Sequence, residues 1–187
     1  MICIITMIKL IDLLKENTES KYKYGCVMLY FKFPELFELQ KSIDPGDVYT
    51  EEGDIKYGFE DEPHCTLLYG LHKEVTLNKV REVIDSYTFS PKPLKAFNIS
   101  CFKNEKYDVL KFEVEGEILY NINNELKQFP YTSDFPDYHP HLTIAYLKPG
   151  CAEEYIKYFK NVEYDLNPEY CIYSHEEVKD KIKINIK

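Results

Sequence analysis

Two short segments of the chain carry almost the same arrangement of residues. The first runs from Pro63 to Tyr69 with the sequence PHCTLLY, and the second runs from Pro140 to Tyr146 with the sequence PHLTIAY. Each segment reads P-H-x-T, followed by two apolar residues and a tyrosine. A single histidine in an apolar strand is more often structural than catalytic, but a repeated P-H-x-T pattern favours a shared chemical role.

The spacing of histidine and threonine within each segment predicts that they lie on one face of a strand. Residues i and i+2 of a strand point to the same side and are about 6.6 Å apart. His64 and Thr66 should therefore share a face, as should His141 and Thr143. If the two strands lie side by side, two imidazoles face each other with a hydroxyl beside each.

Two facing imidazoles suit the cleavage of a phosphodiester without a metal. A histidine titrates near ~6.5, so one imidazole can accept a proton from an attacking hydroxyl or water while the other protonates the leaving oxygen. Each group of this kind contributes on the order of 10²–10⁴ in rate. The threonine hydroxyls can donate hydrogen bonds to the non-bridging phosphate oxygens. The sequence does not indicate which histidine is the acid and which the base.

A metal centre is the main chemical alternative for these histidines. His139 precedes His141 by two residues, and His72 or His175 could supply a third imidazole. However, no carboxylate stands at a familiar ligand spacing, and threonine is a poor metal ligand. We therefore expect neither a metal nor another cofactor, and we interpret His72 and His139 as surface or supporting groups.

The composition restricts the partners and the compartment. The formal net charge is -9, which disfavours binding to long nucleic acid but allows a small phosphorylated ligand in a local pocket. The six cysteines form no C-x-x-C pair, so we expect reduced thiols and a cytoplasmic protein. The apolar run Met1–Ile8 is too short for a membrane span and lacks the layout of a signal peptide.

The apolar periodicity predicts a mixture of helices and strands, and hence an α/β or α+β class. Both P-H-x-T segments fall on strands. Tyr69 and Tyr146 each follow the histidine of their segment by five residues. In a regular strand this odd offset places them on the face opposite the histidine, so we expect them to serve in packing. The expected helices are Ile8–Asn17, Thr76–Ser86, Glu117–Phe129 and Cys151–Lys160, and the expected strands are Tyr24–Phe33, Pro63–Gly70, Ala96–Phe102, Asp108–Glu115, His139–Leu147, Glu169–Tyr173 and Lys181–Ile186.

The two H-x-T strands resemble the paired motifs of the 2H phosphoesterase superfamily, the LigT-like fold. The resemblance extends over nearly the whole chain and implies an α+β fold in one bilobal domain, residues 1–187. That fold has two antiparallel sheet lobes related by a pseudo-twofold axis, outer helices and a central cleft. The resemblance also implies that His64, Thr66, His141 and Thr143 are the catalytic groups.

The residues around the motifs, 60–72 and 138–150, are similar to a narrower group, the phage anti-CBASS nucleases. Those are 2H enzymes that hydrolyse the cyclic di- and trinucleotides of a bacterial anti-phage alarm. The resemblance implies a viral protein of the host-cell cytoplasm that cleaves a 3′–5′ linkage, plausibly through attack by the neighbouring 2′-hydroxyl, and counteracts CBASS.

Recognition of the bases would need aromatic platforms. Tyr24 and Phe102, at the ends of two expected strands, are our candidates, with core packing as the alternative role of each ring. Stacking is worth about 1–3 kcal/mol per base and tolerates different bases. The tail 169–177 could close over a ligand with Tyr170 and Tyr173, and one of its carboxylates, Glu169 or Glu176, could accept from a base edge.

Two other functions fit the same motifs. One is an RNA-end enzyme that opens 2′,3′-cyclic phosphates or handles 2′–5′ linkages, as RNA ligase-like members do. The lysines are scattered, with no basic track leading from the motifs, which disfavours this function. The other is a protein that sequesters cyclic nucleotides without cleaving them, and the intact His and Thr set argues against it. The sequence indicates neither nucleotide preference nor oligomeric state.

Overall fold

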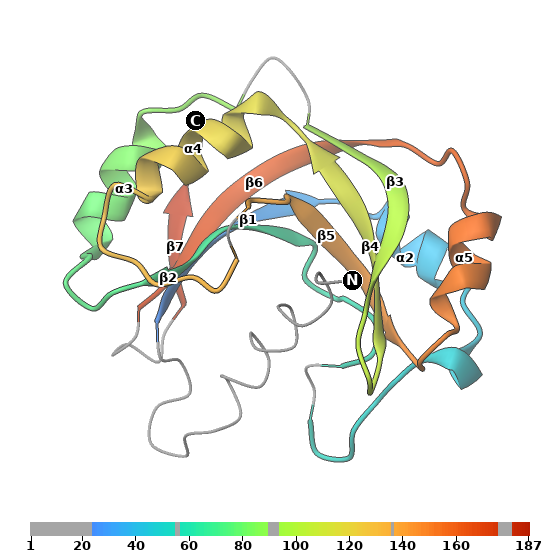
Figure 1. Ribbon diagram of the computed structural model, residues 1–187. Helices are drawn as coiled ribbons and strands as arrows, with labels where there is room; N and C mark the ends of the chain where they lie inside the picture. The colour runs from blue at the N-terminus through green and yellow to red at the C-terminus, as the bar shows by residue number, and fades with distance from the viewer. Residues whose placement is uncertain (1–23, 55–56, 90–93, 136, 176–180) are drawn as a thin grey trace.

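The strands of the computed structural model form one antiparallel sheet (Figure 1). The structure describes residues 24–54, 57–89, 94–135, 137–175 and 181–187. The strands are β1 Gly25–Lys32, β2 His64–Leu71, β3 Leu94–Lys103, β4 Asp108–Glu115, β5 His141–Leu147, β6 Tyr164–Ser174 and β7 Lys181–Asn185. The helices of these residues are α2 Glu35–Gln40, α3 Leu77–Asp85, α4 Glu117–Leu126, α5 Ala152–Tyr158 and the 3₁₀ turn η1 Pro45–Asp47.

Strand β6 joins the two halves of the sheet. The strands follow the order β2-β1-β6-β3-β4-β5, and β7 pairs with β6 outside this path. The first part of β6 pairs with β3 through Leu166 and Leu94, whereas its later part pairs with β1 and β7. The tail segment expected at Glu169–Tyr173 is thus only part of an 11-residue strand.

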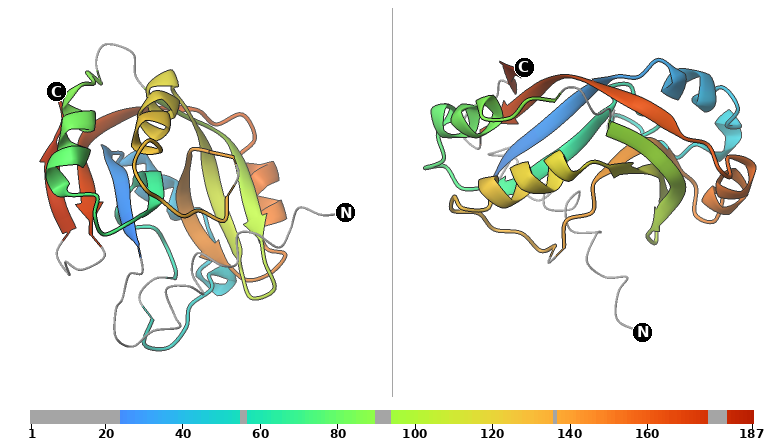
Figure 2. Two further views of the ribbon diagram at one scale, coloured as in Figure 1. Left: turned by 60° about the vertical axis from the view of Figure 1, so that its left-hand side comes forward. Right: turned by 90° about the horizontal axis from the view of Figure 1, so that it is seen from above.

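The sheet is arched, so that its two end strands meet (Figures 1 and 2). Strands β2 and β5 lie at opposite ends of the order and still contact each other. The thiol of Cys65 in β2 reaches the backbone of His141 in β5. The hydroxyl of Tyr138, just before β5, donates to the carbonyl of Thr66 over 3.1 Å. The arch therefore brings the two H-x-T strands together, as the sequence led us to expect.

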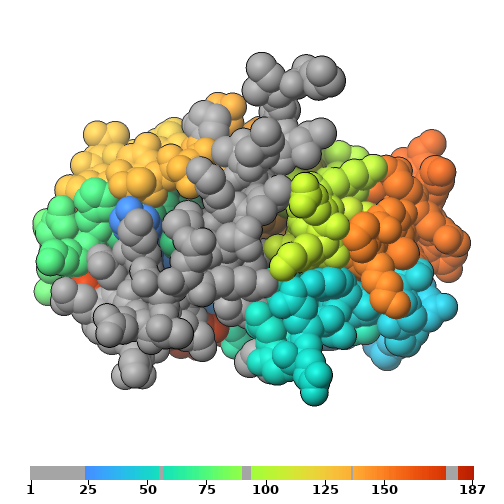
Figure 3. Space-filling model, turned by 60° about the horizontal axis from the view of Figure 1, so that its bottom comes forward, coloured from blue at the N-terminus to red at the C-terminus, as the bar shows by residue number. Residues whose placement is uncertain are grey.

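The helices cover the two halves of the sheet separately. Helices α3 and α4 contact each other and pack on β6 and β2, whereas α5 packs on β3 and β4, and α2 on β5. Figure 3 shows α3 and α4 at one end and α5, in orange, at the other end beside the cyan loop that contains η1. That loop is fastened to α5, because the hydroxyl of Tyr155 donates to Asp47 over 2.7 Å.

The helices form where apolar residues recur at helical spacing. Val80, Val83 and Ile84 of α3 are buried, as are Ile122 and Leu126 of α4. They join a core that includes residues of the H-x-T strands themselves. None of the helices among the described residues is long and apolar enough to cross a membrane.

Most of the expected elements are confirmed, as is the antiparallel α+β class. Helix α2 was missed, although Pro34 precedes it and Leu36, Leu39 and Gln40 are buried on one side at helical spacing. The helix expected at Ile8–Asn17 lies outside the described residues. The arrangement as two pseudo-twofold lobes around a cleft stays a prediction.

Candidate active site

The two H-x-T strands have the same pattern of burial. Within β2, His64 and Thr66 are partly exposed, whereas the residues after each of them are fully buried in the core. The first residues of β5 repeat this order, with His141 and Thr143 partly exposed. Each strand therefore presents its histidine and threonine on one face, away from the core.

A β-bulge follows the threonine in both strands. In β2, Thr66 pairs with Met28 and Leu68 pairs with Val27, so Leu67 is the additional residue. In β5, Thr143 pairs with Lys111 of β4 and Ala145 pairs with Leu110, so Ile144 is the additional residue. A bulge bends the strand and re-aims its side chains, and bulges are common next to active sites.

Buried side-chain amides bind the carbonyls at both bulges. Asn123 of α4 donates through Nδ2 to the carbonyl of Leu67 over 2.7 Å. Gln40 of α2 donates through Nε2 to the carbonyl of Ile144 over 2.9 Å, and also to that of Glu60 over 2.8 Å. Both amides are buried, so each helix fixes the local shape of the H-x-T strand that it covers.

The bulges reverse the expected direction of the two motif tyrosines. Since each bulge shifts the alternation by one residue, Tyr69 and Tyr146 return to the face of the histidines. Tyr146 packs in a ring cluster that also contacts Phe102, and the Phe102 ring meets the ring of His141. The expectation that these tyrosines face away was wrong, because it assumed strict alternation.

The two histidines are held in the same tautomer. Nδ1 of His64 lies 2.7 Å from the carbonyl oxygen of Glu62, and Nδ1 of His141 lies 2.9 Å from that of His139. A carbonyl oxygen only accepts, so Nδ1 must be the protonated nitrogen that donates. Nε2 of each ring is then the nitrogen left for acid–base chemistry.

His64 lies between an aromatic ring and a carboxylate. Its ring stacks on Tyr30 with 5.3 Å between centroids, and Tyr30 stacks in turn on Tyr170 at 5.1 Å. A carboxylate oxygen of Glu60 lies 3.8 Å from Nδ1. Burial raises the pKa of Glu60, and the nearby imidazole of His64 acts in the opposite direction.

His141 has a different environment, which favours its neutral form. The rings of Phe102 and His141 pack edge to face, with 5.0 Å between their centroids. Burial lowers the pKa of His141 to about 4. The hydrogen bond to the carbonyl of His139 and the charge of Glu113 oppose this lowering of the pKa, whereas the charges of Lys111 and His64 act in the same direction as burial. At neutral pH this imidazole is therefore uncharged and able to accept a proton.

A buried lysine lies beside His141. Lys111 is 2% exposed, and its Nζ donates to Ser100 over 2.8 Å and to the carboxylate of Glu113. The same ammonium lies 4.3 Å from the centroid of the Phe102 ring. Sequence reasoning missed Lys111, although a lysine inside the otherwise apolar run VLKF is a detectable signal.

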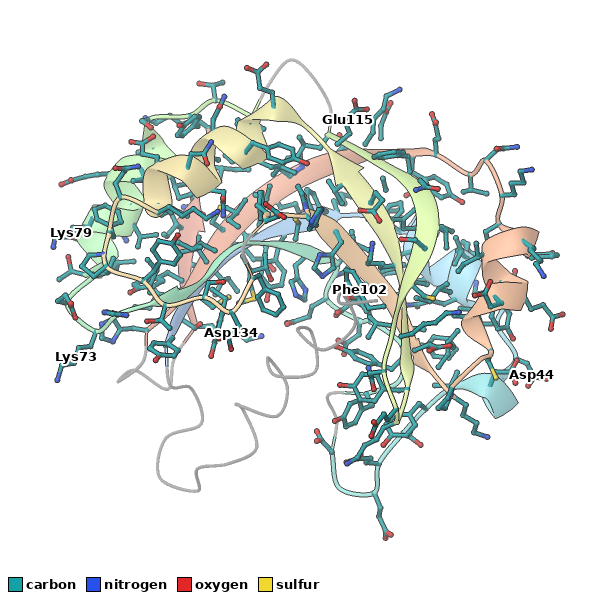
Figure 4. All side chains as sticks on the ribbon, viewed as in Figure 1. Asp44, Lys73, Lys79, Phe102, Glu115 and Asp134 are labelled. Carbon is teal, nitrogen blue, oxygen red and sulfur yellow. The ribbon has the colours of Figure 1, made fainter. Side chains whose placement is uncertain are left out.

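The proposed base-binding residues have different neighbours. Phe102 contacts His141 and lies in the middle of the molecule (Figure 4). Tyr24 stacks on His72 with 5.8 Å between centroids. Glu169 is exposed. It lies in a bulge of β6, between Pro168, which pairs with Phe31, and Tyr170, which pairs with Tyr30. Their roles with a ligand stay predictions.

The tail does not form a separate flap over this face up to Ser174. Tyr173 is fully buried within β6 and donates to the carbonyl of Val75, so its expected contact with a ligand was wrong. Tyr170 belongs to the ring stack described above, and Glu176 lies outside the described residues.

Two of the histidines considered as metal ligands, His72 and His175, have other partners. Nε2 of His72 bonds to Thr132 over 2.8 Å, and Nε2 of His175 bonds to the carbonyl of Lys73 over 2.7 Å. Across the described ranges, no group of three or more His, Cys, Asp or Glu side chains is placed to hold a metal ion.

Comparison with solved structures identifies similar folds. Usb1 of Kluyveromyces marxianus has a TM-score of 0.58 at 8% identity, covering 88% of this chain and 98% of that one. The structure of the same protein with uridine monophosphate has a TM-score of 0.59 at 8% identity, covering 88% and 99%. At this identity the likeness concerns the fold.

Comparison of the sequence with characterised proteins and with families gives different results. No curated protein matches the chain. The model of the family "Anti-CBASS protein Acb1" matches residues 57–183, about two thirds of the chain, and this range contains both H-x-T strands. The chain therefore belongs to the Acb1 family of anti-CBASS proteins, which confirms its resemblance to the anti-CBASS group.

Proposed function

We propose that this protein is a metal-independent phosphodiesterase that hydrolyses the cyclic di- and trinucleotide signals of CBASS. The observation that supports this most strongly is the matched pair of imidazoles on two strands that the arch brings together. Each donates through Nδ1 to a carbonyl, which leaves Nε2 for proton transfer. A threonine follows two residues after each histidine on the same face.

The proposed reaction needs one base and one acid. One Nε2 accepts the proton of a 2′-hydroxyl, whose oxygen then bonds to the adjacent phosphorus. The bond from phosphorus to O5′ breaks, and the other Nε2–H gives its proton to that oxygen. The products of this step are a 2′,3′-cyclic phosphate and a free 5′-hydroxyl. The hydroxyls of Thr66 and Thr143 donate to the non-bridging oxygens, where negative charge accumulates.

Membership of the Acb1 family supports a cyclic oligonucleotide as the substrate. We propose Phe102 and Tyr24 as stacking platforms for its bases and Glu169 as an acceptor for a base edge. The net charge of -9 agrees with a small ligand better than with long nucleic acid. The host cytoplasm is the compartment that this function requires.

An RNA end is the second candidate substrate. A similar fold has been solved with uridine monophosphate, which favours a site for a single terminal nucleotide. The same two histidines would open a 2′,3′-cyclic phosphate through attack by water. The two substrates can be separated directly, because an RNA-end enzyme acts on a linear oligonucleotide that carries a terminal cyclic phosphate.

Incubation with defined substrates in the presence of a chelator tests the proposal. We expect 3′–5′ cyclic dinucleotides and trinucleotides to be cleaved in excess EDTA, with products resolved by liquid chromatography and mass spectrometry. Loss of turnover in EDTA, restored by a divalent cation, would contradict the metal-independent mechanism. Tight binding without cleavage would instead identify a sequestering protein, and cleavage of the RNA end alone would identify the second candidate.

A further inference from the structure

The strands that pair with the two H-x-T strands differ at the positions beside the histidine and the threonine. On one side, β1 places Tyr30 opposite His64 and Met28 opposite Thr66. The corresponding positions on β4 are Glu113 opposite His141 and Lys111 opposite Thr143. The H-x-T strands match in sequence, bulge and Nδ1 partner, so a difference between the two histidines must originate in their neighbours.

Packing alone does not account for the lysine. Removing an ammonium from water is unfavourable, and lysine is almost never fully buried without a partner. At the equivalent position on β1, the apolar Met28 occupies a similar place beside a threonine. A side chain of that length thus fits beside an H-x-T strand without charge, and of these two equivalent positions only the one beside Thr143 carries a charge.

The charged groups that face His141 come from two strands. Lys111 and Glu113 lie on β4, and His64 lies on β2. From β3, Ser100 and Phe102 contribute no charge. The carboxylate of Glu113 would favour an imidazolium, but it already accepts hydrogen bonds from Lys111 and Ser100. Burial would raise the pKa of Glu113, yet these two hydrogen bonds lower it, so the carboxylate stays ionised and engaged.

The other histidine also faces a carboxylate. The carboxylate of Glu60 lies 3.8 Å from Nδ1 of His64, a distance that forms an ion pair once the imidazole is protonated. Glu60 is itself held in place, since its backbone N–H donates to the carbonyl of Ile144 over 3.1 Å. A carboxylate thus lies near each histidine, but only the one near His141 is bonded to Lys111.

We propose that Lys111 is a positioning residue that further favours the neutral form of His141, so that His141 is the general base and His64 the general acid. This assignment rests on the phosphodiesterase reaction proposed above. Nε2 of His141 accepts the proton of the attacking hydroxyl as its oxygen bonds to phosphorus. Nε2–H of His64 gives its proton to O5′ as the bond from phosphorus to O5′ breaks. Proton exchange with water then restores both imidazoles.

The titration of His141 tests this proposal in the absence of substrate. The imidazole signals are followed by NMR from about pH 2.5 to 8, so that the range extends below the parent midpoint, in the parent protein, Lys111→Met and Lys111→Gln, alongside the pH profile of kcat/KM. Without the ammonium, the neighbouring Glu113 favours the imidazolium, so the midpoint of His141 should rise by about one unit. The acidic limb of kcat/KM should rise with it, because that limb reports the base of the free enzyme.

Two controls accompany these variants. Lys111→Arg keeps the charge and should leave the midpoint near its parent value. Lys79→Met makes the same change of net charge at the far end of the molecule (Figure 4), and should have no effect on His141. The glutamine variant retains hydrogen-bonding capacity toward Ser100 and Glu113, so it serves if the methionine variant does not fold.

The outcomes separate this inference from the proposed function. An unchanged His141 midpoint in a folded Lys111→Met or Lys111→Gln variant overturns the role of Lys111, whatever the activity. A midpoint that rises equally in Lys79→Met also overturns it, since net charge would then be the cause. Absence of turnover in the parent protein contradicts the phosphodiesterase and leaves the titration result intact.

Discussion

At the residue scale, each histidine depends on a carbonyl that fixes one ring nitrogen. Glu62 and His139 each stand two residues before a catalytic candidate and accept from Nδ1 through their backbone. Because the acceptor is backbone, substitution of either side chain leaves it in place. The orientation of each imidazole therefore does not depend on the side chain of residue 62 or 139.

Replacement of either imidazole should abolish turnover. We expect His64→Ala and His141→Ala each to lower kcat by about 10²–10⁴, because each removes one proton-transfer group. The rate is measured with a cyclic dinucleotide at saturation. His175→Ala is the control, since this imidazole bonds through Nε2 to the carbonyl of Lys73 and its ring contacts Tyr173, outside the H-x-T strands, so that its loss should leave kcat unchanged.

Circular dichroism at matched concentrations establishes that these variants fold. A histidine variant that folds and keeps more than about a tenth of the parental kcat would remove that residue from the acid–base pair.

The sequence was sufficient to find the four polar groups, because an i, i+2 spacing on a strand places two side chains on one face. The same rule misplaced Tyr69 and Tyr146, because a bulge lies between them and the threonines. The local sequences of residues 67–69 and 144–146 do not indicate a bulge. Lys111 was missed for a related reason, since its importance depends on a strand pairing that brings residues 111 and 143 together.

At the element scale, the H-x-T strands are shaped by helices that lie elsewhere in the chain. Asn123 of α4 and Gln40 of α2 bind the carbonyls of the two bulge residues. The helical periodicity of α4 is visible in the sequence, but the function of a buried amide on its apolar face is not. Helix α2 is short, and its amide acts on a strand more than a hundred residues away.

Loss of the α4 amide should destabilise the protein and disturb the β2 bulge. Asn123→Ala leaves the buried carbonyl of Leu67 without its partner, so we expect a loss of about 1–3 kcal/mol in the free energy of unfolding. Urea denaturation followed by circular dichroism measures this change. Asn124→Ala is the control, because the neighbouring side chain is exposed and should change the free energy of unfolding by less than about 0.5 kcal/mol.

Equal stability of Asn123→Ala and Asn124→Ala would show that the carbonyl of Leu67 does not depend on this hydrogen bond.

The end of β2 depends on a glycine. Gly70 has φ of 106°, and a Cβ added there would lie 1.9 Å from the carbonyl oxygen of Thr132. The same backbone pairs with this loop, since the N–H of Thr132 donates to the carbonyl of Gly70 over 2.9 Å. Gly70→Ala should therefore separate β2 from the loop and lower the free energy of unfolding by more than about 2 kcal/mol.

Gly150 provides a matched comparison for that substitution. Its φ is 86°, and an added Cβ would meet nothing within 4 Å. Gly150→Ala should therefore show only the backbone strain of a positive φ, about 1 kcal/mol. If both variants lose the same stability in urea denaturation, strain alone accounts for Gly70 and the close approach of the loop does not contribute.

At the scale of the whole molecule, the charge distribution favours the small substrate that we propose. The chain has 23 lysines and arginines against 32 aspartates and glutamates. Several exposed lysines are paired with carboxylates, among them Lys181 with Glu62 and Lys41 with Glu38. The buried Lys111 is likewise paired with Glu113. A ligand that needs many phosphate contacts would have to displace such pairs.

The activity should consequently depend weakly on salt. A protein that makes 6–10 phosphate contacts loses about 10³–10⁵ in affinity between 50 and 200 mM salt, because each contact releases counterions. A cyclic dinucleotide offers two phosphates, so we expect KM to rise by less than about tenfold over the same range. Steady-state kinetics at the two salt concentrations measure the change, with a linear single-stranded RNA of twenty nucleotides as the competitor. The contrary result is strong inhibition by the RNA at 50 mM salt that is lost at 200 mM. That result would indicate an extended nucleic-acid-binding surface on this acidic molecule and would favour the RNA-end function.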